Sequence, residues 1–308
     1  MKAARIHQFG PPDVILIEEI PQPTAGPGEV LVRVGAAGVG PWDALIREKR
    51  SVVAAALPLI LGSDLSGTVV QVGPGVSAFK EGDAVYGVTN PMFIGAYAEY
   101  AVASASMIAP RPDSMDDVEA ASVPVVAVTA WQMLFDYADA KSGQSVLIHG
   151  AAGNVGAYAV QLAKRAGLHV IATASAKDLP FVKGLGAAEV LDYHTTRFED
   201  QVSSVDMVLD MVGGDTRERS IKLINPGGIL VSVVSPFPSS QNIPEIRTVF
   251  FLVEVTNARL NALTELFNRR ELVTQVGTVL PFEQVQLAHE MLAGAPHKRG
   301  KIVLQLRA

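Results

Sequence analysis

A glycine-rich stretch in the middle of the chain carries its densest chemical signal. Residues 145–149 have the composition of a short buried strand, and they lead through Gly150-Ala151-Ala152-Gly153-Asn154-Val155-Gly156 into a periodic apolar segment. Glycines let backbone N–H groups approach a phosphate closely, and a helix N-terminus offers unpaired donors and the positive end of its dipole. This pattern predicts a dinucleotide-binding turn with contacts from Gly150, Ala152, Gly153, Asn154, Val155 and Gly156.

The turn departs from the G-x-G-x-x-G fingerprint, because Ala151 occupies the first glycine position while Gly153 and Gly156 fill the other two. A glycine-rich turn without a ligand is the alternative interpretation. The alternation of helices and short apolar strands that follows the turn favours a bound dinucleotide.

The end of the next strand, at residues 169–174, indicates which dinucleotide binds. NAD sites place Asp or Glu there to bind the ribose 2′-hydroxyl, whereas this strand is followed by Ser175 and Lys177. A hydroxyl and an ammonium suit a 2′-phosphate, so we predict NADP(H). Asp178 is the counter-argument, and we interpret it as opening the next helix, where an acidic side chain favours the dipole. Lys177 as an ordinary surface lysine remains open, and so does a contact from Tyr193, after the third strand, to the adenosine end.

The chain contains two kinds of sequence pattern, and both predict elements that position this turn. Residues 1–121 read as short strands separated by turn signals, which suggests a β-rich domain. Residues 122–256 alternate helices with apolar strands and end in an apolar strand at 250–255, which predicts a doubly wound parallel sheet. Residues 257–308 lack a βαβ unit of their own, so we expect them to fold back onto the first domain.

Composition excludes several function classes. The net charge is −6 and the basic residues are scattered, so we expect no nucleic-acid partner. The chain has no cysteine, which excludes disulfides, thiolate zinc sites, iron–sulfur clusters and a cysteine nucleophile. The N-terminus lacks the apolar region of a secretory signal, and the longest apolar run, residues 52–61, contains Pro58 and falls short of a membrane span. A cytoplasmic protein without a membrane partner is expected.

Six further motifs and the glycine-rich turn carry a family resemblance. They are Gly62-Ser63-Asp64-Leu65-Ser66-Gly67-Thr68-Val69, Gly73-Pro74-Gly75-Val76, Lys80-Glu81-Gly82-Asp83-Ala84-Val85-Tyr86-Gly87, Gly95-Ala96-Tyr97-Ala98-Glu99-Tyr100, Thr129-Ala130-Trp131, the glycine-rich turn and Gly300-Lys301-Ile302-Val303-Leu304. With the domain order, they resemble the medium-chain dehydrogenase/reductase superfamily, in particular its zinc-free quinone oxidoreductase (zeta-crystallin-like) branch. The resemblance implies an α/β fold: a Rossmann-type NADP(H)-binding domain at 122–256 and a GroES-like domain at 1–121, completed by 257–308.

The positions of the zinc ligands decide between branches of this superfamily. Zinc-dependent relatives carry a cysteine, a His and a Ser or Thr where this chain has Gly40-Pro41-Trp42, and Gly-His-Glu where it has Gly62-Ser63-Asp64. The six histidines show no ligand spacing. We therefore expect no metal site. The resemblance then implies zinc-independent hydride transfer from NADPH to an electrophilic small molecule, either a quinone or an α,β-unsaturated carbonyl (enone or enal).

Individual roles follow from the same resemblance. Thr129, Val212, Val234 and Phe251 match positions where relatives touch the cofactor, although core packing would also explain them. Tyr86 is the preferred proton donor, and Asp43 and Tyr97 lie on segments that border the substrate in relatives. Many relatives have Asn where this chain has Gly40, so one contact to nicotinamide or substrate is missing.

Two further expectations remain. Relatives often dimerise through Rossmann sheet edges, and the apolar residues 249–253 suit such an edge, which predicts a homodimer. The rival to an enzyme is a non-catalytic NADPH-binding protein with a redox-sensing or structural role.

Overall fold

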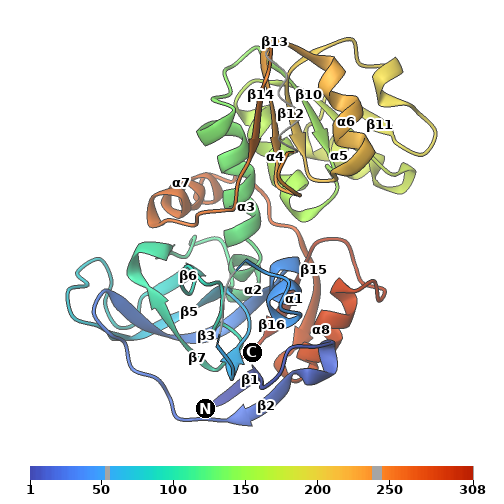
Figure 1. Ribbon diagram of the computed structural model, residues 1–308. Coiled ribbons are helices and arrows are strands. Elements are labelled where there is room, and N and C mark those ends of the chain that lie inside the picture. The colour runs from blue at the N-terminus through green and yellow to red at the C-terminus, as the bar shows by residue number, and fades with distance from the viewer. Residues whose placement is uncertain (53–55, 238–244, 308) are drawn as a thin grey trace. The chain divides into compact units, whose positions relative to one another are not determined.

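A computed structural model describes residues 1–52, 56–237 and 245–307 (Figure 1). The chain divides into two compact units. The β-rich unit consists of Met1–Val125 and Glu254–Ala308, and the parallel-sheet unit consists of Val126–Val253. The boundaries expected from the sequence, after residues 121 and 256, lie close to these limits.

Six parallel strands form the sheet of the parallel-sheet unit. They are β9 (Ser145–His149), β10 (His169–Ala174), β11 (Glu189–Asp192), β12 (Val205–Asp210), β13 (Ile224–Ser232) and β14 (Arg247–Phe250). Their order is β11-β10-β9-β12-β13-β14, and every neighbouring pair is parallel. Chain order reverses between β9 and β12, and in such sheets a dinucleotide binds beyond the carboxyl ends of the strands at that reversal.

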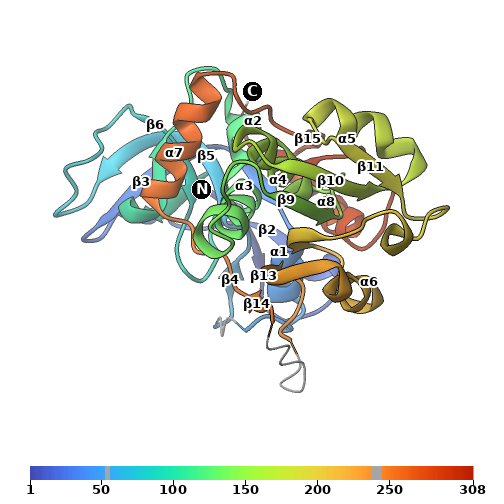
Figure 2. The ribbon, with the colours of Figure 1, turned by 90° about the horizontal axis from the view of Figure 1, so that it is seen from above.

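The helices of this unit precede or connect its strands. They are α3 (Pro124–Trp131), which begins just before the unit boundary and continues as the π-helix Gln132–Tyr137, α4 (Asn154–Arg165), α5 (Leu179–Leu185) and α6 (Gly214–Ser220), with short 3₁₀ turns at Ala176–Asp178, Phe198–Asp200 and Ile221–Leu223. Helices α4 and α5 contact β10 (Figure 2). Buried apolar residues such as Leu147, Val208 and Leu230 fill a core that Phe198 closes.

The prediction of a strand at residues 250–255 is wrong beyond Phe250. Strand β14 starts at Arg247 and ends at Phe250, where it pairs with Ser232 of β13. Phe251 leaves the sheet and packs its ring against Tyr137, with centroids 4.4 Å apart. The apolar run therefore reflects side-chain burial beyond the strand as well as sheet pairing.

The β-rich unit contains two sheets. One has the order β2-β1-β4, and the other has the order β15-β16-β3-β5-β6-β8, with β7 also pairing with β3. The strands are β1 (Lys2–Ile6), β2 (Leu16–Glu19), β3 (Glu29–Val39), β4 (Leu59–Ile60), β5 (Asp64–Val72), β6 (Ala84–Val88), β7 (Tyr100–Ser104), β8 (Ile108–Pro110), β15 (Val276–Pro281) and β16 (Lys301–Gln305). Their inward residues, among them Val32, Leu65, Val85 and Ile302, make one core.

The C-terminal return completes this unit. Strand β16 pairs antiparallel with β3, so Ile302 lies opposite Val39. Helices α1 (Pro41–Arg47), α2 (Asp117–Ala121), α7 (Asn257–Asn268) and α8 (Val285–Leu292) belong to the same unit, with 3₁₀ turns at Pro12–Val14, Ala105–Met107 and Phe282–Gln284. A doubly wound parallel sheet and a separate β-rich unit are thus both present, as the sequence predicts. In the described part of the chain, no helix is both long and apolar enough to cross a membrane.

Tyr86 links this return to β6. Its fully buried hydroxyl donates to the carbonyl oxygen of Leu260 in α7 at 2.9 Å. We expect Tyr86→Phe to lower the free energy of unfolding by about 1 kcal/mol, because the variant loses this hydrogen bond. Urea denaturation measures the change. Tyr100→Phe, at a partly exposed tyrosine of the same unit, is the matched control. Equal midpoints for the two variants would contradict the assignment.

Candidate functional site

The predicted dinucleotide turn is the short connection between the end of β9 at His149 and the start of α4 at Asn154. Gly150 has a φ of +72°, in the left-handed region, and Gly153 donates its N–H to the Gly150 carbonyl oxygen at 3.0 Å. A Cβ added to Gly156 would lie 2.2 Å from that carbonyl oxygen. The first turn of α4 therefore packs directly on the backbone of the glycine turn, and position 156 accepts only glycine.

The N-terminus of α4 is open to a ligand. Gly153 is its N-cap, and no side chain caps the helix. The first N–H groups of a helix lack intrahelical partners, and here they belong to Asn154, Val155 and Gly156. Backbone donors at the positive end of a helix dipole suit the charge of a pyrophosphate. The six residues predicted for the turn thus lie together and fit a dinucleotide phosphate.

Val212 and Val234 lie beside this turn at the carboxyl edge of the sheet. Val212 Cγ2 is 3.4 Å from the position of a Cβ on Gly150, and Val234 Cγ1 is 2.8 Å from that of a Cβ on Gly213. Their exposed fractions are 51% and 45%. The loops after β12 and β13 therefore present two apolar side chains near the glycine turn, and their contact with a cofactor stays a prediction.

Asp210, which the sequence analysis missed, holds these loops in place. This fully buried carboxylate accepts the N–H of Val212 at 3.0 Å and of Gly213 at 2.7 Å on one oxygen. Its other oxygen accepts the hydroxyl of Ser232 at 2.8 Å. An acidic residue at the end of an apolar strand was the available signal, because a buried carboxylate needs several donors.

At the end of β10, Ser175 donates its hydroxyl to the Asp178 carboxylate at 2.6 Å. Asp178 occupies the N-cap position of α5, as expected, but its side chain makes no capping hydrogen bond there. Lys177 is exposed. The hydrogen of the Ser175 hydroxyl is therefore used by Asp178, and the oxygens of this pair can accept a hydrogen bond from a ribose hydroxyl.

The remaining cofactor candidates lie in different surroundings. Tyr193, 55% exposed, follows β11 and donates its N–H to the carbonyl oxygen of Ala174 at 3.2 Å, which places it beside the end of β10. Thr129 is buried within α3. Phe251 is buried against Tyr137. Core packing accounts for the position of Phe251, and its contact with a cofactor stays a prediction.

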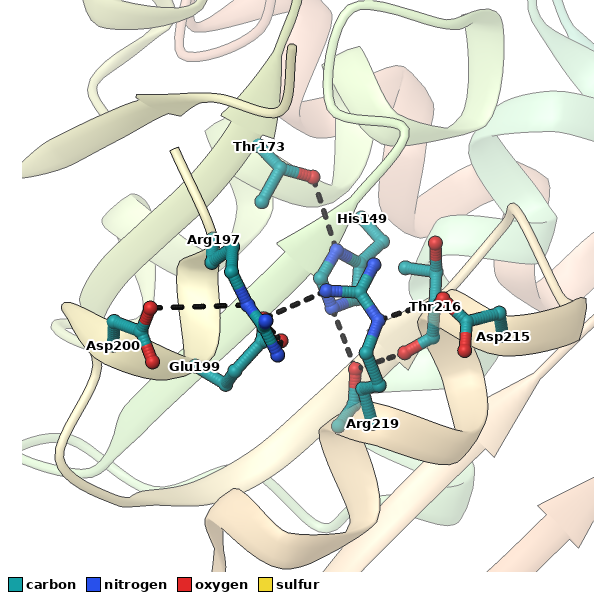
Figure 3. Close-up of polar contacts among 9 residues, drawn as sticks. His149, Thr173, Arg197, Glu199, Asp200, Asp215, Thr216 and Arg219 are labelled. Carbon is teal, nitrogen blue, oxygen red and sulfur yellow. Dashed lines mark hydrogen bonds and ion pairs between the residues drawn. The ribbon is translucent and has the colours of Figure 1, made fainter. Parts of the chain in front are cut away.

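A buried histidine closes β9 immediately before the glycine turn (Figure 3). His149 Nδ1 lies 3.0 Å from Thr173 Oγ1, and Nε2 lies 2.8 Å from Ser220 Oγ. Ser220 donates its only hydroxyl hydrogen to the Thr216 carbonyl oxygen, so it must accept a hydrogen bond from Nε2. This fixes a neutral tautomer with its proton on Nε2. Burial lowers the pKa of His149 to about 4.

Aromatic and ionic contacts surround His149. Its ring meets the edge of Phe198 with centroids 4.7 Å apart, and the guanidinium of Arg219 covers Phe198. Arg219 also pairs with Glu199 at 2.7 Å and with Asp215 at 2.8 Å (Figure 3). The hydrogen bond from Arg219 lowers the pKa of Glu199 to about 2. These contacts fasten α6 to the segment after β11 and so support the base of the glycine turn.

The β-rich unit contains a buried charged pair at the positions of the missing zinc ligands. Lys301 Nζ lies 2.8 Å from Asp64 Oδ2, and both side chains are buried. The ammonium also lies 4.1 Å from the centroid of the Trp42 ring, and the Trp42 indole donates to Ser63 Oγ at 3.0 Å. Among the residues that the structure describes, no three His, Asp or Glu side chains gather to hold a metal ion.

Asp43 lies on the first turn of α1 and is fully buried. Its Oδ2 accepts the N–H of Gly40 at 2.8 Å and the hydroxyl of Tyr97 at 2.9 Å. Its Oδ1 has no hydrogen-bond partner within the described residues. Burial raises the pKa of Asp43 to about 7, against the opposing effects of the Gly40 N–H and the Lys301 charge. Asp43 therefore holds a proton up to neutral pH.

The other predicted proton donor, Tyr86, is placed differently. Its hydroxyl donates to Leu260 and lies 3.1 Å from Thr264 Oγ1, and burial raises its pKa. The structure brings Asp43 and Tyr97 into contact but gives Tyr86 a separate partner in α7. Its catalytic role stays a prediction, while the contacts describe a structural link.

Comparison with known proteins agrees with both halves of this description. Residues 26–113 match the alcohol dehydrogenase GroES-like domain, and residues 185–304 match a family described as zinc-binding dehydrogenase. The quinone oxidoreductase of Mus musculus is 31% identical over 99% of this chain and 98% of its own length. The chain belongs to the quinone oxidoreductase branch of the medium-chain dehydrogenases/reductases.

Solved structures of this branch support the assignment. The quinone oxidoreductase from Coxiella burnetii has a TM-score of 0.91 and 35% identity, covering 100% of this chain and 99% of that one. A mycobacterial protein complexed with NADPH has a TM-score of 0.87 and 29% identity, covering 99% of this chain and 100% of that one. An oxidoreductase that uses a nicotinamide cofactor is therefore established at the level of the family.

The depressed pKa of His149 predicts acid sensitivity. The unfolded chain binds a proton at His149 near pH 6.5 and the folded chain only near pH 4, so stability is lost as pH falls through this window. We expect the melting temperature of His149→Asn to fall less steeply between pH 6.5 and 4 than that of the wild type. His169→Asn, at an exposed histidine, controls for general effects. Identical slopes in all three proteins would disprove the assignment.

The raised pKa of Asp43 predicts that stability depends on pH in the opposite direction. Its pKa is about 7 in the folded chain and near 3.8 when unfolded, so its contribution to stability is complete in acid and is lost as pH rises to 7. Relative to Asp43→Asn, the wild type should therefore lose melting temperature between pH 4 and 7 and then level off. Asp139→Asn, at an exposed aspartate, should show no such trend. A wild type that gains melting temperature relative to Asp43→Asn between pH 4 and 7 would contradict the raised pKa.

Proposed function

We propose that this protein is a zinc-independent reductase that transfers hydride from NADPH to a quinone or to an α,β-unsaturated carbonyl. The Lys301–Asp64 pair beneath Trp42 carries this proposal. Where zinc-dependent relatives have ligands, this chain has Gly40, an indole hydrogen-bonded to a serine, and a carboxylate already paired with an ammonium. This donor set does not fit zinc, because zinc takes Cys, His and free carboxylate ligands.

The cofactor side of the proposal rests on the parallel-sheet unit. Asn154, Val155 and Gly156 would bind the pyrophosphate through backbone N–H groups, and Val212 and Val234 would contact the nicotinamide half. Lys177 would receive the 2′-phosphate, which supports NADPH over NADH. Ser175 would join it only by releasing its hydrogen bond to Asp178. When bound, the reduced nicotinamide supplies the hydride. The NADPH complex of the mycobacterial relative supports the same choice.

The acceptor must already be electron-poor, because no metal polarises it. Hydride addition to the β-carbon of an enone, or to a quinone, places negative charge on an oxygen that then takes one proton. Asp43 is the better supported of the two predicted proton donors. A proton on its Oδ1 would have no acceptor among the described residues, whereas the Tyr86 proton is already donated to Leu260.

A non-catalytic NADPH-binding role is the second candidate. The burial of both Asp43 and Tyr86, at 0% exposure each, favours it, since neither side chain reaches solvent in the described structure. Such a protein would gain thermal stability on adding NADPH without consuming it.

The proposal also includes a homodimeric assembly and a cytoplasmic location. Strand β14 forms an edge of its sheet, and within the described residues it pairs only with β13, so its outer side would pair with a second copy in a homodimer. Composition supports a cytoplasmic location and small molecules, rather than nucleic acids or membranes, as partners.

The test is oxidation of NADPH, with NADH in parallel, followed by absorbance with a small quinone and a small enone as separate acceptors. We expect turnover with NADPH, and a kcat/KM at least about tenfold above that with NADH, because an ammonium facing a phosphate strengthens the contact by about that factor. If neither nucleotide is consumed while NADPH raises the melting temperature, the binding role replaces the reductase.

Lys177→Ala sharpens this test. It should lower kcat/KM for NADPH about tenfold and leave NADH unchanged, since only NADPH carries the 2′-phosphate. Lys222→Ala removes another exposed lysine of the same unit and serves as the control. A preference for NADH in the wild type would instead assign the ribose contact to Asp178.

A further inference from the structure

The β-rich unit contains a polar pocket that includes none of the residues assigned to the cofactor or the acceptor. Its volume is about 400 Å³, which is in the range that suits a small organic molecule. Its lining residues are Arg33, Gly35, Thr68, Arg111, Asp116, Asp117, Val118, Gln305 and Arg307. All of them belong to the β-rich unit, so the pocket is a property of that unit alone.

Sheet pairing places Arg33 at the centre of the residues around this pocket. Strand β3 pairs with β5 and with β7, so Arg33 lies opposite Thr68 on one side and opposite Tyr100 on the other. Residues directly opposite each other in antiparallel strands share a face of the sheet. The guanidinium of Arg307 lies 5.8 Å from the centroid of the Tyr100 ring. Two arginines and a hydroxyl therefore gather on one face of the sheet.

The two carboxylates of the lining already have partners. Asp117 Oδ1 accepts a hydrogen bond from Arg111 at 2.6 Å and from the Ser66 hydroxyl at 2.7 Å. Asp116 Oδ1 accepts the N–H of Glu119 at 2.8 Å and so caps α2. Three arginines and two aspartates give the lining a net charge of +1, whereas the whole chain has a net charge of −6.

Arg33 and Arg307 carry the charge that no carboxylate compensates. Both side chains are exposed, and neither forms an ion pair with any residue that the structure describes. Two cations that line one pocket repel each other, and a bound anion would remove this cost. Guanidiniums present forked N–H donors that fit the oxygens of a phosphate or a carboxylate. Thr68 and Gln305 add a neutral hydroxyl and amide donor to the same lining.

Gly35 holds the two ends of the lining against β3. A Cβ on Gly35 would lie 2.1 Å from Asp117 Oδ2, so the carboxylate occupies the space that a side chain would need. The Gly35 carbonyl oxygen accepts the N–H of Leu306 at 2.9 Å and of Arg307 at 3.2 Å. The backbone that carries Arg307 and the carboxylate that pairs with Arg111 are therefore both fixed before any ligand binds.

We propose that this pocket binds a small phosphate monoester through Arg33 and Arg307. A phosphate monoester carries up to two negative charges on three terminal oxygens, which matches two guanidiniums and two neutral donors. A carboxylate offers one charge and two oxygens, and so satisfies fewer of these groups. The volume of the pocket leaves room for a small organic group on the phosphate. This inference goes beyond the proposed reductase function and does not rest on it.

Calorimetric titration with glycerol 3-phosphate tests the site, with succinate and glycerol titrated in parallel. We expect one glycerol 3-phosphate to bind per chain, at least about tenfold more tightly than succinate, because only the phosphate uses all four donor groups. Glycerol should give no binding heat, since it carries no charge. An affinity for succinate equal to that for glycerol 3-phosphate, or no binding of glycerol 3-phosphate, would overturn the proposal.

Substitutions of the two unpaired arginines locate the site. Arg33→Gln and Arg307→Gln should each weaken the binding of glycerol 3-phosphate about tenfold, because each removes one charged fork. Their melting temperatures should stay close to that of the wild type, since neither arginine forms an ion pair among the described residues. Arg270→Gln, at an exposed arginine of the same unit outside the pocket, should leave the affinity unchanged. Equal weakening in all three variants would show a general attraction of charge and overturn the site.

The glycine turn is the other place where a phosphate could bind. The same titration in the presence of excess NADPH should give an unchanged affinity for glycerol 3-phosphate. Competition between the two ligands would place the phosphate at the glycine turn and overturn the proposal. The result is independent of turnover, because a wild type that oxidises neither nucleotide refutes only the reductase function.

Discussion

The buried pair of Lys301 and Asp64 is the contact on which the β-rich unit depends. Removing one partner of such a pair leaves the other charge uncompensated in the interior, at a cost of about 3–5 kcal/mol. Lys301 begins the last strand and Asp64 begins β5, so the pair joins the C-terminal return to the N-terminal strands. The same ammonium supports Trp42, and α1, which carries Trp42, also carries Asp43. A single cation thus joins two strands of the sheet and contacts the helix that carries Asp43.

Burial shifts the pKa values of Asp43 and His149 in opposite directions. Burial disfavours the charged form of both groups, which keeps a proton on the carboxyl and keeps one off the imidazole. His149 stays neutral in a fixed tautomer and acts as a rigid support below the glycine turn. Asp43 stays protonated up to neutral pH, and one of its oxygens has no hydrogen-bond partner among the described residues. Burial therefore keeps one titratable group of each unit in its neutral form.

The sequence predicted the parallel-sheet unit well because its signals are local. Strands β9 and β10 match the predicted ranges 145–149 and 169–174, since apolar runs bounded by turns define buried parallel strands. The glycine turn was equally readable, because its backbone geometry requires glycine at position 156. By contrast, the pairing of Ser175 with Asp178 could not be predicted, since either side chain alone suggested a different nucleotide.

In the β-rich unit, the decisive contacts are long-range. Lys301 and Asp64 are more than two hundred residues apart in the sequence, and no local pattern connects them. Tyr86 looked like a proton donor from its residue type, but its partner Leu260 lies in the returning segment.

The division of the chain also determines the order in which the two units are completed during synthesis. The parallel-sheet unit is inserted between the two segments of the β-rich unit. During synthesis at roughly 5–20 residues per second, its strands are complete tens of seconds or less after they begin, while the β-rich unit still lacks β15 and β16. Until Lys301 emerges, the carboxylate of Asp64 has no cation to pair with in the interior. The nascent chain therefore contains every strand of the parallel-sheet unit while the sheet of the β-rich unit still lacks β15 and β16.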